Sequence, residues 1–414
     1  MLRNALAAAK PASGGSGTSR QGAPGKDGVC MALKPGYKQT EVGMIPEDWN
    51  VEVLADKSKI VDSLHRTPKF SLDGYPMVRV TDIKPGNLNL KGTLKVNEAV
   101  YSEFTRNYKP KRGDIVLSRV GSYGVSSYVE TDEPFCLGQN TVVVESKIPA
   151  RYLYFVLNSK NIREQIENES YGSGYKSLSL KNIKELFIPF PQTKAEQTAI
   201  ANALSDADAL IQSLASLIAK KRQIKQGTMQ TLLNPHENGR LKEGWVVKKL
   251  GNILRVCHGK SQHEVTDRNG KYPILATSGE IGRASKYLYD KPSVLIGRKG
   301  TIDVPQYMGH PFWSIDTLFY TEIFEPNNAK YLFYQFNLID WYAHNEASGV
   351  PSLSARTIEN IDISIPSPEK QVQIALILSE MDTEIAALEA KLAKYRHIKQ
   401  GMMQNLLTGR IRLI

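Results

Sequence analysis

Three short motifs in this sequence contain residue types that catalytic or ligand sites use, but each motif is incomplete. The Asn-Pro-His segment at 234–236 is the nearest match to the Asn/Asp-Pro-Pro-aromatic loop that holds a flipped adenine for methylation, and a proline here more simply ends a helix. The Gly-Lys-Ser segment at 259–261 resembles the end of a phosphate-binding loop, but Leu254 occupies the position of its first glycine. His258 and His263 lack cysteine or acidic partners at metal-ligand spacing. We therefore expect no catalytic, cofactor or metal site within this chain.

The charge balance instead favours a polyanionic partner. The chain of 414 residues has a formal net charge of +11, and lysine and arginine side chains displace the counterions condensed on nucleic acid. With 41% hydrophobic and 23% charged residues, the composition is that of a globular protein with room for two or three domains. No stretch approaches the ~20 apolar residues of a membrane-spanning helix. Three widely spaced cysteines fit neither a disulfide framework nor a metal site, so we expect a soluble, cytoplasmic protein.

The chain contains an internal repeat. Residues 224–233 and 398–407 both read Ile-Lys-Gln-Gly-x-Met-Gln-x-Leu-Leu, and each copy closes a long helical pattern. Matching residues precede it in the same order in each half: Trp49 and Trp245, Tyr75 and Tyr272, Arg119 and Arg298, and Tyr152 and Tyr331. The offset falls from 197 residues at Tyr75 to 179 at Arg119, which indicates about 18 additional residues in the first half, within 87–112.

Within each half the expected elements are short and mixed. Runs of β-branched and aromatic residues predict strands at 115–117 and 141–144 in the first half and at 294–296 and 317–320 in the second. Apolar spacing predicts one helix at 151–168 and another at 329–345. Glycine-containing loops connect these elements, and such loops commonly carry binding residues. Each half is therefore expected to be a mixed α/β unit with its binding residues in loops.

Two heptad stripes predict long helices that pair with each other. The first stripe consists of Ile200, Leu204, Ala207, Ile211, Leu214 and Ile218, and the second of Ile374, Leu378, Met381, Ile385, Leu388, Leu392 and Tyr395. Steps of three and four residues keep one apolar seam facing a partner helix. A single stripe could pack on its own domain, but two stripes in the same register favour mutual pairing.

The connection between the repeats indicates that these helices run antiparallel. Each helix of about 40 residues would extend roughly 60 Å, whereas about ten residues separate the end of the first helix near Pro235 from Trp245 in the second half. A parallel pair would require this linker and the second half to return along that length. We therefore expect an antiparallel pair with the globular halves at opposite ends, related by an approximate two-fold axis.

Such an arrangement suits duplex DNA. Two similar units at fixed separation, related by a two-fold axis, can contact half-sites that lie about one helical turn apart on the same face. Divergent loops would let each unit read a different sequence, so we expect an asymmetric, two-part target with an unread gap. A rival is a coiled-coil scaffold protein without sequence-specific DNA binding, while the missing catalytic loop disfavours a methyltransferase fragment.

Several duplicated motifs carry a resemblance to a known family. They are the lead-in from Tyr37 to Trp49, the Gly-Ser-rich turns before Leu178 and Leu353, the proline-containing segments at 188–191 and 365–368, and both Lys-Gln-Gly helix ends. In this order, they make the chain resemble the specificity (S) subunit, HsdS, of Type I restriction-modification systems. The resemblance covers nearly everything after residue 34.

The residue patterns and the resemblance together give an expected fold. It is α+β, with two mixed α/β target recognition domains joined by two long antiparallel coiled-coil helices in a pseudo-two-fold internal repeat. The expected parts are a flexible N-terminal tail at 1–34, the first target recognition domain at 35–190, a central spacer helix at 191–236, the second target recognition domain at 237–366, and a distal spacer helix with the C-terminal tail at 367–414.

The resemblance also implies partners. They are double-stranded DNA, two methyltransferase (M) subunits that bring S-adenosylmethionine, and, in a restriction complex, restriction (R) subunits that bring ATP and Mg²⁺. This chain itself would hold no cofactor and would carry no catalysis.

Candidate DNA contacts follow the predicted strands. Arg119 and Arg298 lie at equivalent positions before glycines, so each guanidinium could reach a base edge or a phosphate. An ion pair with a nearby carboxylate is the alternative for both. Further candidates beside them are Ser122, Tyr123, Lys299 and Thr301.

The other candidate contacts differ between the halves. Gln139 and Asn140 could read adenine through their amides, where the second half has Asp316. Arg79 is matched by Ala276, so a role in reading DNA would be particular to the first half. Phosphate contacts, with solvated surface as the alternative, are expected at Lys84, Lys176, Lys260, Arg283 and Lys286.

The repeated helix ends are candidate partner sites. We expect two matched pairs to help seat one M subunit each: Lys225 with Gln226, and Lys399 with Gln400. Interaction with the helix dipole is the simpler explanation for the basic residues. The glycines that follow, Gly227 and Gly401, cost about 1 kcal/mol each within a helix. We expect a close backbone contact at these glycines, with a kink as the alternative.

Overall fold

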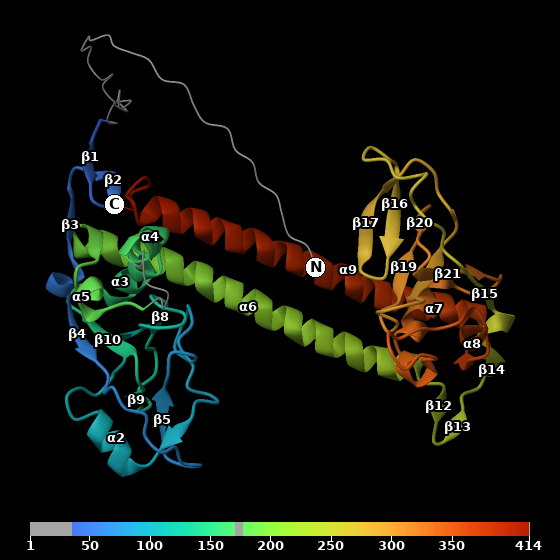
Figure 1. Cartoon of the computed structure of the whole chain (residues 1–414), viewed down its shortest axis with the longest axis horizontal. Coiled ribbons are helices and arrows are strands. Elements are labelled where there is room, and N and C mark those ends of the chain that lie inside the picture. Colours follow the sequence, from blue (N-terminus) through green and yellow to red (C-terminus); the bar gives the residue numbers. More distant parts are fainter. Residues whose placement is uncertain (1–34, 170–176, 414) are drawn as a thin grey trace, which may run out of the picture.

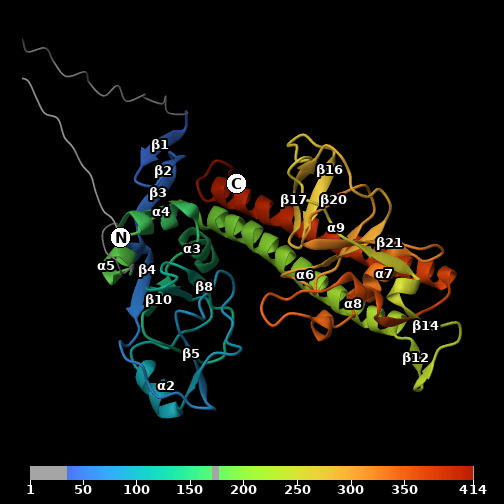
Figure 2. The same ribbon diagram turned by 45° about the vertical axis from the view of Figure 1, so that its right-hand side comes forward.

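The computed structural model of this chain describes residues 35–169 and 177–413, so the expected tail at 1–34 and the candidate Lys176 lie outside the described residues. Two long helices, α6 (Lys194–Leu233) and α9 (Pro368–Leu406), lie side by side as a rod, and one globular half packs near each end of it (Figure 1). The same arrangement is visible after rotation (Figure 2). Within the described ranges, no helix is both long and apolar enough to cross a bilayer.

The local sequence explains where the rod helices begin. At the start of α6 the hydroxyl of Thr193 accepts a hydrogen bond from the backbone N–H of Glu196 (3.3 Å), which satisfies a donor that the first helical turn leaves free. Pro368 occupies the first position of α9, where its missing N–H costs nothing. The helices have 40 and 39 residues, or about 60 Å each.

The two rod helices run antiparallel. Lys225, near the end of α6, forms an ion pair with Asp382 in the first half of α9. Lys399, near the end of α9, forms one with Asp208 in the first half of α6. Between these ion pairs the predicted stripes face each other and bury Leu214, Ile218, Ile385 and Leu392. Burial of each such side chain contributes ~1.5–3 kcal/mol, so the apolar seam stabilises the rod more than the surface ion pairs do.

The first globular half combines short strands and helices. Its four-stranded sheet has the order β4 (Ser58–Asp62), β10 (Thr141–Ser146), β7 (Ile115–Ser118), β8 (Ser126–Tyr128). Its three-stranded sheet has the order β6 (Lys95–Val96), β5 (Tyr75–Val78), β9 (Cys136–Leu137). Two lead-in pairs are β1 (Tyr37–Thr40) with β2 (Gly43–Pro46) and β3 (Trp49–Val53) with β11 (Phe187–Pro191). The helices are α1 (Leu54–Lys57), α2 (Glu98–Phe104), α3 (Ala150–Leu157), α4 (Lys160–Glu169) and α5 (Leu180–Lys184).

The second half repeats this plan. Its four-stranded sheet has the order β15 (Leu254–Cys257), β21 (Leu318–Ile323), β18 (Ser293–Gly297), β19 (Gln306–Met308). Its three-stranded sheet has the order β17 (Gly279–Ala284), β16 (Tyr272–Ala276), β20 (Trp313–Ser314). The paired strands outside these sheets are β12 (His236–Glu237) with β13 (Arg240–Leu241) and β14 (Val246–Lys249) with β22 (Asp362–Ile365). The helical segments are η1 (Leu250–Asn252), α7 (Ala329–Phe336), η2 (Trp341–His344) and α8 (Ala355–Glu359).

Two predicted helices are wrong as single elements. The segment at 151–168 is divided into α3 and α4, and the segment at 329–345 contains α7 and the short η2. In both places an asparagine side chain, Asn158 or Asn337, donates to the carbonyl four residues earlier (3.0 and 2.7 Å). Such side-chain bonds compete with continuation of the helix. The additional residues of the first half, within 87–112, contain β6 and α2.

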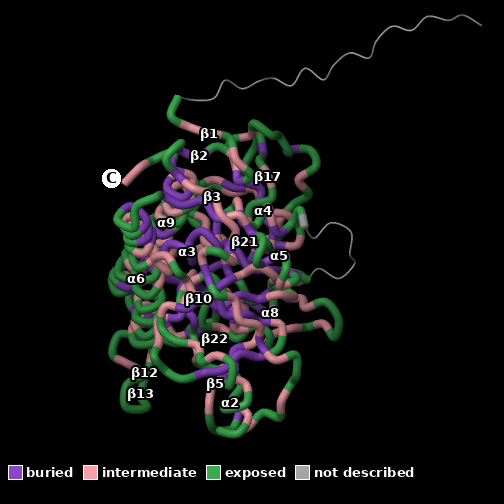
Figure 3. Tube along the Cα trace, turned by 90° about the vertical axis from the view of Figure 1, so that its left-hand side faces the viewer, coloured by how far each residue is buried: buried purple, intermediate pink, exposed green. Residues whose placement is uncertain are grey.

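Each globular half is packed on both rod helices. The core of the first half includes Ile200 and Leu204 from the start of α6 and Leu406 from the end of α9. The core of the second half includes Leu233 from the end of α6, with Ile374 and Leu378 from the start of α9. Buried residues follow α3 and β10 through the interior, whereas α6 is largely exposed (Figure 3). The position of each half is therefore set by two helices rather than by one connection.

Candidate nucleic-acid interface

The two predicted arginines lie at equivalent ends of the four-stranded sheets. β7 ends where β10 begins, and β18 ends where β21 begins. Arg119 directly follows β7, and Arg298 directly follows β18. The carbonyl of each arginine accepts a hydrogen bond from the leucine of the repeated turn, Leu178 (2.8 Å) or Leu353 (3.0 Å). The two loops therefore have matching backbone hydrogen bonds, as their predicted equivalence requires.

Arg119 is held inside the chain by an ion pair. Its Nη1 lies 3.0 and 2.9 Å from the two carboxylate oxygens of Asp62, and its Nε donates to the carbonyl of Leu178 (3.1 Å). The Arg119 side chain is 16% exposed. Its backbone N–H also donates to the carbonyl of Asn140 (2.9 Å). Arg119 therefore joins three segments at the sheet end, which is the alternative foreseen for this residue, and its contact with DNA stays a prediction.

Arg298 has a different environment. Its Nη1 donates to the carbonyl of Asp316 (3.3 Å), and no carboxylate of the described residues lies within ion-pair distance. The strand registers explain the difference. Asp62 pairs with Val142, the second residue of β10, whereas β15 ends at Cys257 opposite Tyr320, and the next residue, His258, is the one that lies against Phe319, the second residue of β21. The His258 ring packs edge-on against Phe319 (4.9 Å). The guanidinium of Arg298 is consequently available to an external anion or base.

Gln139 and Asn140 form the turn that leads into β10. Gln139 is exposed, and its Oε1 accepts a hydrogen bond from the Thr67 hydroxyl (3.2 Å). Asn140 has a φ of 64°, a left-handed conformation that asparagine tolerates better than most residues. Residues in such conformations cluster at binding sites. The amide of Gln139 is therefore presented at the surface by a sharply turned backbone.

Arg79 lies beside this turn. Its guanidinium pairs with Asp82 (3.2 Å) and its backbone N–H donates to the same carboxylate (2.9 Å). A Cβ atom at Gly138 would lie 3.2 Å from the Arg79 Cγ, so the arginine stem packs directly on the turn. The structure thus brings together Arg79, Arg119, Gln139 and Asn140, which the sequence places up to 61 residues apart.

The remaining candidates do not form one cluster. Ser122 and Tyr123 line a cavity of about 210 Å³ that also involves α3 and α4. Arg283 pairs with Glu280 (3.1 Å). Thr301 and Asp316 are exposed. Four exposed lysines have no ion pair within the described part of the chain, which leaves them free for phosphate: Lys84, Lys260, Lys286 and Lys299.

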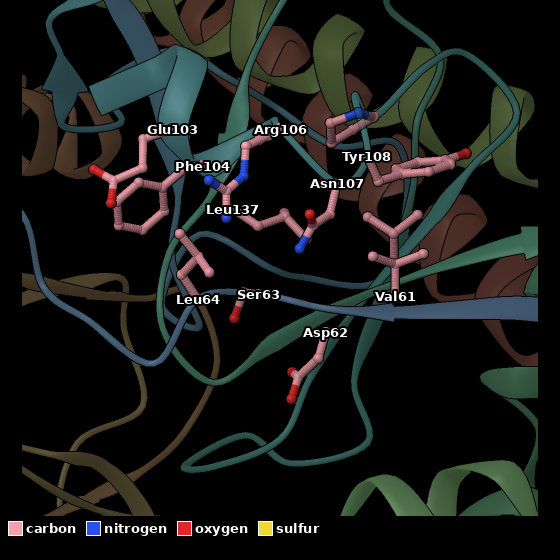
Figure 4. Close-up of a pocket in the computed structure, with 12 residues that line it drawn as sticks. Val61, Asp62, Ser63, Leu64, Glu103, Phe104, Arg106, Asn107, Tyr108 and Leu137 are labelled. Carbon is pink, nitrogen blue, oxygen red and sulfur yellow. The ribbon is translucent and has the colours of Figure 1, made fainter. Parts of the chain in front are cut away.

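A second group of polar residues at this sheet end was not predicted. Arg106 and Asn107, which follow α2, line a pocket with Asp62 and Ser63 at the end of β4 (Figure 4). Arg106 is exposed and has no ion pair among the described residues. Burial and the neighbouring Asp114 raise the pKa of Tyr108 in the same pocket, so its hydroxyl stays protonated and donates to that carboxylate (2.9 Å). The sequence did contain an indication of this group. Arg106 and Asn107 lie within 87–112, where the first half has additional residues that the second half lacks.

At the repeated Lys-Gln-Gly segments one expectation is wrong, the close contact at the glycines, while the seating of M subunits stays a prediction. Lys225 and Lys399 are engaged in ion pairs within the rod, whereas Gln226 and Gln400 are exposed. The close backbone contact expected at the two glycines is absent, since a Cβ atom at residue 227 or 401 would meet no described atom within 4 Å. Both glycines lie inside continuous helices. Within the described residues, then, packing gives no reason for a glycine at either position.

In the part of the chain that the structure describes, no grouping of side chains suits a metal ion. Among residues 35–169 and 177–413, no three His, Cys, Asp or Glu side chains are arranged to hold one. The two sheet ends carry arginine, lysine, amide and hydroxyl side chains, which suit hydrogen bonding to bases and phosphates, together with the carboxylates of Asp62 and Asp316.

Comparison with known proteins gives consistent results for both halves. The family model for the Type I restriction modification DNA specificity domain matches residues 46–225 and 242–395. A protein of Methanocaldococcus jannaschii described as a candidate specificity subunit of the type I restriction enzyme MjaX is 27% identical over 91% of this chain and 97% of its own length. The MjaIX specificity subunit of the same organism is 22% identical over 91% of this chain and 96% of its own length.

The fold is also similar to a solved structure. The crystal structure of the S subunit of a Type I restriction-modification system from M. genitalium superposes with a TM-score of 0.63 at 20% identity, and the match covers 86% of this chain and 96% of that one. This likeness concerns the fold, whereas the family model spans most of both halves. The chain belongs to the family of Type I restriction-modification DNA specificity subunits.

Proposed function

We propose that the chain reads a two-part, asymmetric DNA sequence, with one recognition domain on each half-site and an unread gap between them. As a specificity subunit it is non-catalytic, and partner subunits carry out methylation and cleavage. The observation that carries the proposal is the duplicated sheet end, with Arg119 and Arg298 at equivalent positions in halves held by the same antiparallel rod. An approximate two-fold axis would relate the halves as it relates the strands of a duplex.

The dimensions of the rod are compatible with this target. Asp208 and Lys225 mark the positions on α6 near which the two halves pack, and they are separated by 17 residues, about 25 Å of helix. One turn of DNA is roughly 34–36 Å. Recognition domains that extend outward from these positions would meet half-sites about one turn apart, on one face of the duplex.

The differences between the halves support unlike half-sites. Arg119 is paired with Asp62, whereas Arg298 is not paired with a carboxylate of the described residues. The insertion that supplies Arg106 and Asn107 is particular to the first half. A pair of domains with different hydrogen-bonding groups at equivalent places would read different bases.

The exposed face of the rod supports docking of two M subunits. On α6 the exposed apolar residues Leu210, Leu217 and Ile224 recur every seven residues, with 38%, 39% and 46% of their surface exposed. Ile398 on α9 occupies the position of Ile224 in the repeat and is 43% exposed. Exposed apolar residues can mark protein interfaces. Glu384 and Lys391 stand on α9 where Leu210 and Leu217 would repeat, so only Ile224 and Ile398 are duplicated, and we place the two equivalent seats at these isoleucines. S-adenosylmethionine would enter with these subunits, and ATP with Mg²⁺ through an R subunit.

A footprint tests the proposal. The chain should be purified with and without its M partner, and duplexes selected from a random pool should be mapped by hydroxyl-radical cleavage. The proposal predicts two protected segments about one turn apart, with adenine methylation only when M is present. Absence of sequence-selective binding under both conditions would favour a scaffold protein instead.

A further inference from the structure

The ion pairs of the two Lys-Gln-Gly segments are copies of each other. Lys225 on α6 pairs with Asp382 on α9, and Lys399 on α9 pairs with Asp208 on α6. The two lysines are 174 residues apart, and so are the two aspartates. In both pairs the lysine side chain is 22% exposed and the aspartate 37% exposed. The repeat therefore preserves the interaction and its environment.

Each ion pair also contacts a recognition domain. The ammonium group of Lys399 lies 5.6 Å from the ring centre of Phe155 on α3, and that of Lys225 lies 5.5 Å from the ring centre of Tyr334 on α7. We call Asp208, Lys399 and Phe155 the first latch, and Asp382, Lys225 and Tyr334 the second latch. Every latch therefore joins three helices: both rod helices and one helix of a domain, α3 in the first latch and α7 in the second.

The two latches differ in one hydroxyl group. The Tyr334 hydroxyl donates a hydrogen bond to Oδ2 of Asp382 (2.7 Å), whereas Phe155 has no group that could bond to Asp208. The second domain is therefore bound to its latch by one hydrogen bond more than the first.

Another ion pair between the rod helices lacks these features. Arg222 pairs with Glu389 (2.6 Å), but the repeat has Ala215 where a matching acid would stand. No aromatic ring of the described residues is in contact with the Arg222 guanidinium. The interaction that recurs in both copies is thus the one that reaches a domain, which indicates a role in placing the domains rather than in holding the rod together.

We propose that the two latches are positioning elements that fix the distance and rotation between the half-sites, and hence the number of unread base pairs. This inference rests on the proposed two-part recognition. One additional base pair shifts a half-site by ~3.4 Å and rotates it by ~35°. A domain rejects the wrong gap only when it cannot follow such a displacement. A charged contact across three helices opposes this movement, because sliding or tilting the domain would separate the lysine from its carboxylate and its ring.

The test uses the chain in complex with its M subunit and a pool of random duplex DNA. After methylation, sequencing of the modified sites gives the half-site sequences and the distribution of gap lengths. The double variant Asp208→Asn with Asp382→Asn should keep the half-site sequences and broaden the gap distribution to one base pair on either side. The matched control Glu389→Gln removes an ion pair of the rod alone and should leave the distribution unchanged.

A charge-exchange variant distinguishes loss of the ion pair from misfolding of the protein. In the first latch, where no hydroxyl is involved, Lys399→Asp with Asp208→Lys restores an ion pair and should restore a narrow gap distribution, whereas Lys399→Asp alone should broaden it. The inference is overturned if the aspartate double variant, folded by circular dichroism, gives the same gap distribution as the wild type. It is also overturned if Glu389→Gln broadens the gap equally. If the proposed two-part recognition itself is wrong, the wild-type complex will yield no two-part sequence. This result is distinguishable from an unchanged gap distribution in the variants.

Discussion

The C-terminal segment after α9 is fixed to the start of the chain by Arg412, and this contact allows a quantitative prediction. The Arg412 guanidinium contacts both oxygens of Glu196 (2.6 and 2.8 Å) at the start of α6 and both oxygens of Asp48 (2.9 and 2.7 Å) in the lead-in. Glu196 is only 4% exposed. The Tyr37 hydroxyl adds a hydrogen bond to the carbonyl of Gly409 (3.0 Å). The end of α9 is thereby connected to the first half.

The substitution Arg412→Ala would leave the Glu196 carboxylate buried without its cation. Breaking a buried pair by removal of one partner costs ~3–5 kcal/mol, whereas the half-exposed Asp48 pair contributes at most ~1 kcal/mol. We therefore expect the free energy of unfolding to fall by about 3–5 kcal/mol. The measurement is urea unfolding followed by tryptophan fluorescence, because Trp49 is fully buried and its ring lies 5.9 Å from the guanidinium.

Two further variants make this prediction refutable. Arg410→Ala removes a nearby exposed arginine that has no ion pair among the described residues, so it should change stability by less than ~0.5 kcal/mol. Adding Glu196→Gln to an Arg412→Met background removes both charges and should recover part of the loss. Equal stability of the Arg412→Ala and Arg410→Ala proteins would refute the reasoning.

The same contact predicts a dependence on pH. Hydrogen bonds from Arg412 lower the pKa of the Asp48 carboxyl below its usual value of 3.8. Stability from a carboxyl with a lowered pKa is fully present above the unfolded value and is lost as pH falls through the folded value. The difference in unfolding free energy between wild type and Arg412→Ala should therefore narrow below about pH 4. A difference that widens with falling pH would contradict the assignment.

Other predictions concern the loops and the rod. Arg298→Ala should weaken binding to one half-site by about 1–3 kcal/mol without loss of stability, whereas Arg119→Ala should also lower the melting temperature because it removes the Asp62 ion pair; DNA binding and thermal unfolding distinguish the two. Gly227→Ala should stabilise the isolated chain by about 0.5–1 kcal/mol in urea unfolding, since a methyl group there meets no described atom, and destabilisation would indicate an overlooked contact. Ile398→Glu should reduce the M:S ratio measured by light scattering from two to one, and Ile224→Glu with Ile398→Glu should abolish docking; an unchanged ratio would place the seats elsewhere.

The sequence alone was sufficient for the features that depend on local periodicity. The heptad steps from Ile200 to Ile218 and from Ile374 to Tyr395 predicted the rod, and its antiparallel direction followed from the short linker before Trp245. The strands before Arg119 and Arg298 were also found, because their apolar runs are short and sharply ended. The ends of α3 and α7 were missed, since the bonds of Asn158 and Asn337 that end them follow from single side chains rather than from a pattern.

The site could be predicted only in part, because its contacts join distant residues. Arg119 and Asp62 are 57 positions apart, and Lys225 and Asp382 are 157 apart. Which partner each cation meets depends on strand and helix register. The place of Asp62 in the first half is taken in the second by His258, the residue that follows β15 and lies against Phe319. For this reason the sequence predicted equivalent loops for Arg119 and Arg298 but not their different pairing, and it did not predict the ion pairs of Lys225 and Lys399 within the rod. The roles of these residues toward DNA and M subunits stay predictions.

The most direct test of the two-part recognition is the sequence of the adenine-methylated sites that this chain selects from a random duplex pool in complex with its M subunit. We predict two short, different half-sites separated by a constant number of unspecified base pairs, with their centres about one DNA turn apart. A single continuous motif, two identical half-sites or methylation without sequence preference would contradict this account.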